Sequence, residues 1–268
     1  MTGAETPLPA FPVPRLRTMT GATELAVAEA AASARNRPEA VTALIAALFE
    51  TVGDRPATPE TARALSPATR EYLLQWSAAR LHPETRWFEA HCTACGEPYD
   101  IALDLAEPAI REPDHADATV TVATSLGPRD FALPTGAHEE MLARQPAGRD
   151  PRRAFAALCG LAPDAAGEAE SFDDHDLALI DEAVEAASPD IADTVRLACP
   201  ACGEETECRI DPLQFAFPNE GGILADMHLI AGAYGWPPAE ILTLSARHRS
   251  RLADLIDRDR RAGDGRRR

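Results

Sequence analysis

Two short motifs in this chain of 268 residues pair cysteines at a spacing suited to metal binding. They are Cys92-Thr-Ala-Cys95-Gly-Glu and Cys199-Pro-Ala-Cys202-Gly-Glu, and we call each a knuckle. Four thiolates in two Cys-x-x-Cys pairs are a ligand set typical of structural zinc, and such a tetrahedral site leaves no position open for a substrate. The spacing therefore predicts one structural Zn²⁺ per chain, bound by Cys92, Cys95, Cys199 and Cys202.

The same four cysteines could instead be free thiols, disulfides or a redox pair, so the cellular compartment matters. The N-terminus has neither the basic start nor the apolar run of a signal peptide, and no segment approaches the roughly 18 apolar residues of a membrane span. We therefore expect a cytoplasmic protein without a membrane span, where structural disulfides are rare. The other two cysteines, Cys159 and Cys208, fall at apolar positions and are expected to be buried small hydrophobic residues.

Strand-like sequence flanks each knuckle, and the two regions form an internal repeat. At a constant offset of 107, the segment from Leu65 aligns with the segment from Phe172, and no gap is needed through the knuckles. Each segment starts with N-cap residues, continues as a helix to a stop near Pro83 or Pro189, and then gives strand, knuckle and strand. We infer a duplicated unit in which each copy supplies half of one Cys₄ site, with a pseudo-twofold axis through the metal.

The remaining segments predict a hairpin, loops and a helical end. Residues 118–124 alternate like a strand and are followed by a second strand or hairpin within 127–136, after which Thr135 begins a helix. Proline and glycine predict loops over 53–61, 144–151 and 163–171. In residues 221–256, three short helices are expected: a stripe of Ile223, Met227, Ile230 and Tyr234 marks the first, Gly235 ends it, and Ser245 caps the third.

The expected fold class is therefore α+β and mostly helical, with duplicated helix-strand-knuckle units forming one split zinc ribbon. The length and the 45% apolar content allow one large or two small domains. The predicted organisation is an extended Pro-rich arm over 1–20, a first helical and zinc-knuckle half over 21–106, an inserted strand/helix segment with the second zinc-knuckle half over 107–218, a C-terminal helical module over 219–261 and a basic tail over 262–268.

Charge and missing motifs exclude several classes of function. The net charge is −17, from 43 acidic residues against 26 basic ones, all of them Arg, and such a surface repels phosphate backbones. The sequence contains no phosphate-binding glycine loop, no Gly-x-Ser-x-Gly and no His-Glu-x-x-His. The acidic run Asp173–Asp176 lies at a predicted helix start, where carboxylates act as caps. We predict that the protein is not an enzyme and does not bind nucleic acid.

Two stretches resemble proteins of contractile, phage-tail-like particles. His228-Leu-Ile-Ala-Gly-Ala-Tyr234-Gly-Trp236-Pro237-x-x-Glu240-Ile-Leu-x-Leu244, followed by an Arg-rich helix, resembles a segment of small tail and baseplate assembly proteins. The order Leu133-Pro134-Thr135, apolar helix, Asp-led helix and Cys199-Pro-Ala-Cys202-Gly203 resembles the T-even-type phage baseplate family. The resemblance covers about residues 118–256 and contains no catalytic motif.

What the resemblance implies is a baseplate component or assembly chaperone of a contractile injection system, present in the cytoplasm or incorporated in the particle. Its partners would be baseplate, tube, sheath or spike subunits. Leu133, Pro134 and Thr135, with the aromatic pair Tyr234 and Trp236, are the candidate partner surface, although the same residues could serve as core. Two alternatives stay open, a zinc-ribbon regulator of transcription and a redox-sensitive zinc protein.

Overall fold

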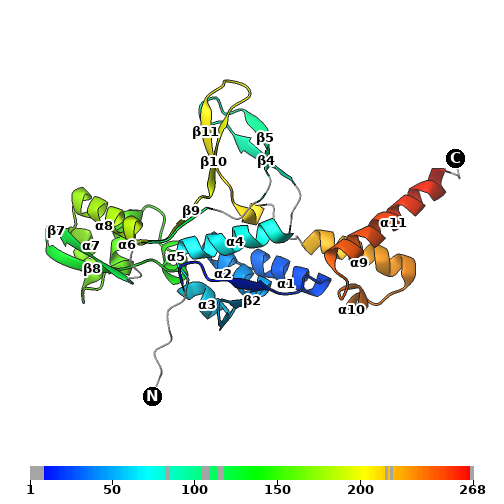
Figure 1. The fold of residues 1–268 in the computed structure, drawn as a ribbon, viewed down its shortest axis with the longest axis horizontal. Coiled ribbons are helices and arrows are strands. Elements are labelled where there is room, and N and C mark those ends of the chain that lie inside the picture. The colour runs from blue at the N-terminus through cyan, green and yellow to red at the C-terminus, as the bar shows by residue number, and fades with distance from the viewer. Residues whose placement is uncertain are drawn as a thin grey trace, which may run out of the picture.

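A computed structural model describes residues 9–81, 85–103, 105, 109–113, 118–214, 217 and 220–265. It mixes helices with small antiparallel sheets, in agreement with the α+β prediction. Figure 1 shows a central helical unit, a second unit at one end, the C-terminal helices at the other end, and the hairpins of residues 86–103 (β4–β5) and 194–209 (β10–β11) projecting from one side. Within these ranges, no helix is both long enough and apolar enough to cross a membrane.

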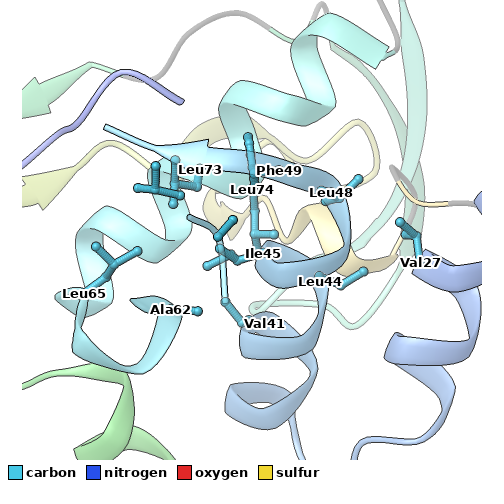
Figure 2. Packing of buried hydrophobic residues seen from close by; sticks show 12 residues of the cluster. Val27, Val41, Leu44, Ile45, Leu48, Phe49, Ala62, Leu65, Leu73 and Leu74 are labelled. Atoms are coloured by element: carbon cyan, nitrogen blue, oxygen red, sulfur yellow. The ribbon is translucent and has the colours of Figure 1, made fainter. Parts of the chain in front are cut away.

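The central unit is built from four helices and a three-stranded sheet. Side chains of Thr20, Asn36 and Thr58 accept backbone N–H groups at the starts of three of the helices. Its core lies around the second helix, and Figure 2 shows Leu44 and Leu48 on the side of Val27, with Val41 and Ile45 on the side of Ala62 and Leu65. The elements are α1 (Gly21–Ala32), α2 (Arg37–Leu48), α3 (Pro59–Ala64), α4 (Pro67–Leu81), β1 (Pro14–Leu16), β2 (Phe49–Val52) and β3 (Arg55–Pro56).

The predicted Pro-rich arm is extended where it is described, and it docks on the central unit. Strand β1 pairs antiparallel with β2, which places it at an edge of the sheet. The Thr69 hydroxyl donates to the carbonyl of Ala10 over 2.6 Å, and the ring centroids of Phe11 and Tyr72 lie 5.3 Å apart. Residues 9–16 therefore belong to the packed structure of this unit.

The second unit combines the predicted hairpin with four helices. Its core contains Val122 and Phe131 from the hairpin and Leu177, Ile180 and Val184 from the last helix. The elements are β7 (Thr119–Thr124), β8 (Gly127–Ala132), α5 (Gly136–Leu142), α6 (Pro151–Cys159), α7 (Ala165–Ser171) and α8 (Asp174–Ala187). Thr135 caps α5 as predicted, but its partner in the capping box is His138, whose Nδ1 accepts the N–H of Thr135 over 3.1 Å.

The internal repeat is visible in the elements themselves. An offset of 107 carries α4 onto α8, and it carries β4 (Arg86–His91) and β5 (Pro98–Leu103) onto β10 (Thr194–Ala198) and β11 (Glu205–Arg209). The predicted stop at Pro83 lies outside the described residues. The loops predicted over 53–61 and 163–171 are wrong in part, because α3 and α7 form there. Ala62 and Ala169, equivalent under the offset, are fully buried and fix these short helices to the two cores.

One buried cation marks the junction of the two units. Arg70 of α4 is 1% exposed and occupies the position that Leu177 fills in the second copy. Its Nη2 donates to the Pro38 carbonyl over 2.6 Å, and its Nη1 lies 3.3 Å from the Glu139 carboxylate of α5. Gly136, at the start of α5, packs directly on the guanidinium. This contact joins α5 to α2 and α4.

The C-terminal residues form the three predicted helices, α9 (Glu220–Tyr234), α10 (Pro238–Ile241) and α11 (Ala246–Gly265). Helix α11 has 20 residues, longer than the short helix predicted, and it continues past Gly263 into 262–265 of the predicted basic tail. Ile230, Ile241 and Ile256 form the core between these three helices. Arg249, 3% exposed, joins α11 to α1 through Glu24, with 2.6 Å between Nη1 and Oε2.

Candidate metal centre

The two knuckles are the tips of two antiparallel hairpins, β4–β5 and β10–β11. In both, the glycine after the second cysteine closes the turn: the N–H of Gly96 donates to the Cys92 carbonyl over 2.9 Å, and that of Gly203 donates to the Cys199 carbonyl over 2.8 Å. These glycines have φ angles of 76° and 78°, in the left-handed region that favours glycine. The repeated sequence therefore produces the same turn twice.

The structure brings all four predicted ligands together. Their sulfur atoms lie within 4.8 Å of one another, although the two knuckles are more than a hundred residues apart in the sequence. Two sulfur contacts cross between the hairpins: Cys92 lies 3.7 Å from Cys202, and Cys95 lies 3.8 Å from Cys199. In both contacts, the first cysteine of one knuckle meets the second cysteine of the other.

Hydrogen bonds and crowding act in opposite directions on the ionisation of these thiols. The N–H groups of Cys95 and Ala94 point to the Cys92 sulfur, and the buried Thr206 hydroxyl lies 3.6 Å from it. The bond from Cys95, followed by that from Thr206, lowers the pKa of Cys92 to about 6. For Cys202 the Glu204 N–H favours the thiolate, but desolvation and the nearby sulfurs outweigh it and raise the pKa to about 12. A bound cation would allow all four thiolates to coexist, so the cluster is compatible with a metal site.

Contacts at the hairpin bases hold the cluster together. The short strand β6 (Ile110–Arg111) pairs antiparallel with β9 (Asp190–Ile191), which brings the segment after the first hairpin beside the segment before the second. Arg37 of α2 binds both Glu71 of α4, 2.9 Å from its Nη2, and Asp211, 3.0 Å from the same nitrogen. The second hairpin is therefore anchored to the central unit, and no spacing in the sequence indicated this.

The loop Leu133–Thr135 does not approach the cysteines. It lies between the two units, where the N–H of Gly136 donates to the Leu65 carbonyl over 2.9 Å. Pro134 lines a groove of about 260 Å³ with residues from both units, namely Ser66, Pro67, Ala68, Phe155, Asp181, Val184, Glu185, Ser188 and Pro189. Leu133, Pro134 and Thr135 are each half-buried.

Tyr234 and Trp236 lie at the corner between α9 and α10, also apart from the cysteines. Their ring centroids are 5.6 Å apart, and the residues are 47% and 40% exposed. The predicted stripe on α9 is buried at Ile223 and Ile230 but not at Tyr234. The pair is thus an exposed aromatic surface next to a small core.

Of the remaining sequence predictions, some are confirmed and one is wrong. Cys159 is 1% exposed in the second core, where burial raises its pKa to about 11, whereas Cys208 is only half-buried. Asp173 caps α8 as predicted, accepting the N–H groups of His175 and Asp176. Sequence reasoning missed Thr206 because a single threonine in a strand gives no signal of a bond to sulfur.

Comparison with known protein families, curated proteins and solved structures gives no match for this chain, so the functional argument rests on the geometry and on the sequence.

Proposed function

We propose that the four cysteines bind one structural Zn²⁺ as a split zinc ribbon. Tetrahedral coordination with Zn–S bonds of about 2.3 Å places neighbouring sulfurs about 3.8 Å apart. The two cross-hairpin distances are 3.7 and 3.8 Å, and this match is the observation that carries the proposal. Four protein ligands close the coordination sphere, so the ion would stabilise the joined hairpins and would not activate water.

Metal analysis of single-cysteine variants tests the zinc site. The purified chain should contain one zinc, and Cys95→Ser should lose it, because serine does not supply a thiolate. Cys208→Ser is the matched control: it changes a strand cysteine outside the cluster and should keep the metal. The proposal is wrong if the unmodified chain contains no stoichiometric metal and melts cooperatively at the same temperature with and without a chelator.

We further propose that the protein is a non-enzymatic baseplate component or assembly chaperone of a contractile phage-tail-like particle. The support is the sequence resemblance over residues 118–256, together with a closed cysteine site. The exposure of Tyr234 and Trp236 suits the interface role that the resemblance implies, since aromatic side chains are enriched among residues that anchor protein interfaces.

A tagged pull-down from the native host, read by mass spectrometry, tests this function. Recovery of tube, sheath, spike or baseplate subunits supports it, and Trp236→Ala should reduce their recovery while leaving the fold intact. Trp87→Ala is the control, because Trp87 is 70% exposed on β4, away from the C-terminal corner. Recovery of polymerase or nucleic acid would instead favour a transcription regulator, and loss of zinc on mild oxidation with a change in binding would favour a redox-sensitive protein.

A further inference from the structure

Strand β7 has one paired edge and one open edge. It pairs only with β8 in a two-stranded sheet, and the N–H of Leu133 donates to the carbonyl of Ala118 just beyond the paired residues. In an antiparallel ladder, residue pairs that exchange backbone hydrogen bonds alternate with pairs that do not, so this one bond shows which residues of β7 bond to β8. Val120 and Val122 do. The N–H and C=O groups of Thr119, Thr121 and Ala123 point away from β8. Pro128, which has no N–H, faces Ala123 in a non-bonded pair, as this phase requires.

The two outer edges of this small sheet differ in their backbone partners. The outer edge of β8 is occupied, because the N–H of Leu161 donates to the Asp130 carbonyl and Gly160 bridges to Phe131. Within the described part of the chain, no residue bonds to the outward backbone groups of β7. Figure 1 shows this hairpin at the end of the molecule opposite the C-terminal helices.

The sequence of β7 lacks the features that usually protect an open edge. Thr-Val-Thr-Val-Ala-Thr has no charge and no proline, and most of its residues are β-branched. Natural proteins block such edges with lysine, proline or a bulge, since an unblocked edge invites another strand. The edge of β7 is therefore open to pairing with another strand.

We propose that the open edge of β7 pairs antiparallel with β7 of a second copy of this chain. A twofold axis at Thr121 sets Thr121 against the partner's Thr121, and Thr119 against the partner's Ala123. Three residue pairs then exchange six backbone hydrogen bonds and form a continuous four-stranded sheet. The proposal does not depend on the function proposed above.

Self-complementarity selects a second copy over an unrelated strand. Each of the facing pairs joins small uncharged side chains, so no like charges oppose one another. On the outer face the nearest carboxylate is Asp130, one strand away from Thr121. Three strand spacings, about 14 Å, would separate the backbones of the two Asp130 residues, and each carboxylate accepts a hydrogen bond from the Thr121 hydroxyl of its own chain over 2.6 Å. On the other face, Val120 and Val122 already pack against α8 in the core of the second unit, so the pairing rests on the backbone bonds and on the outer-face side chains.

Sedimentation of the full chain at increasing concentration, at physiological salt, tests the pairing. The monomer mass is 28.7 kDa, and a shift toward twice that mass is expected. The register is tested by two variants at the same positions. Thr119→Lys with Ala123→Lys places like charges opposite each other twice and should weaken dimerisation about tenfold, whereas Thr119→Lys with Ala123→Glu places opposite charges together and should preserve the dimer.

Circular dichroism must show the same folded content for both variants, and both keep every backbone bond to β8. A chain that stays monomeric at all concentrations overturns the proposal, and the edge would then be open to a strand of another protein. A dimer that both variants retain equally, or that both lose equally, also overturns it, because the pairing would not follow the predicted register.

Discussion

Replacement of Arg249 by methionine tests how the C-terminal helices are held to α1. Arg249 is 3% and Glu24 is 7% exposed, and the ion pair between them is 2.6 Å long. Breaking a buried pair by removing one charge costs about 3–5 kcal/mol, because the other charge stays buried without a partner. We expect the lower value, about 3 kcal/mol, because Nε and Nη1 of Arg249 are in ion-pair contact with carboxylates but make no hydrogen bond.

Native-state hydrogen exchange measures this loss where it occurs. A decrease of about 3 kcal/mol in the opening free energy of α9 and α11 raises their exchange rates roughly 100-fold, while α2 should exchange as before. The double variant Glu24→Gln/Arg249→Met removes both charges of this pair and should recover much of the protection, because Asp226, 3.4 Å from Nε of Arg249, keeps its hydrogen bond from the Ser250 hydroxyl. The reasoning is refuted if the single variant exchanges within a few-fold of the unmodified chain, or if the double variant is no better protected than the single one.

Three further predictions concern the packing of Gly136, the protonation of His138 and the burial of Cys159. Gly136→Ala should lower the melting temperature by several degrees, since its Cβ would overlap the buried guanidinium of Arg70; an unchanged melting curve would contradict this packing. Burial lowers the pKa of His138, so its contribution to stability is present above its ordinary pKa of about 6.5 and is lost as the pH falls below it; denaturant titrations should show His138→Gln losing less stability than the unmodified chain over that range. Cys159, with its pKa raised to about 11, should stay unmodified by iodoacetamide at pH 8 in the folded chain; rapid labelling found by peptide mapping would refute its burial.

The internal repeat made much of this fold predictable, because two aligned copies within one sequence indicate the same elements twice. The helices that start after Ser66 and Asp173, both hairpins and the meeting of the four cysteines follow from one offset. Short helices were harder: α3 has six residues, too few for a periodic pattern, and it is fixed by the burial of Ala62. The same limit applied to α7.

Long-range polar contacts had no sequence signal at all. Arg70 occupies a position where the second copy has leucine, so the pattern alone predicts a solvent-exposed charge or a break in the repeat. Its burial depends on α5, a segment that the repeat does not contain, which supplies Glu139 beside the guanidinium and Gly136 packed against it. Likewise, nothing near Arg37 indicated that it would reach Asp211, which lies 174 residues further along the chain.

The distance between the knuckles along the chain has a consequence for biosynthesis. Counted from Cys92 to Cys199, the second half of the cluster follows the first by 107 residues. At about 5–20 residues per second, the ribosome needs roughly 5–20 s to supply the missing sulfurs. During that interval the first hairpin can offer an ion only two thiolates, while the central helices are already available to fold around their own core. Closure of the cluster is therefore a late event in the maturation of the chain.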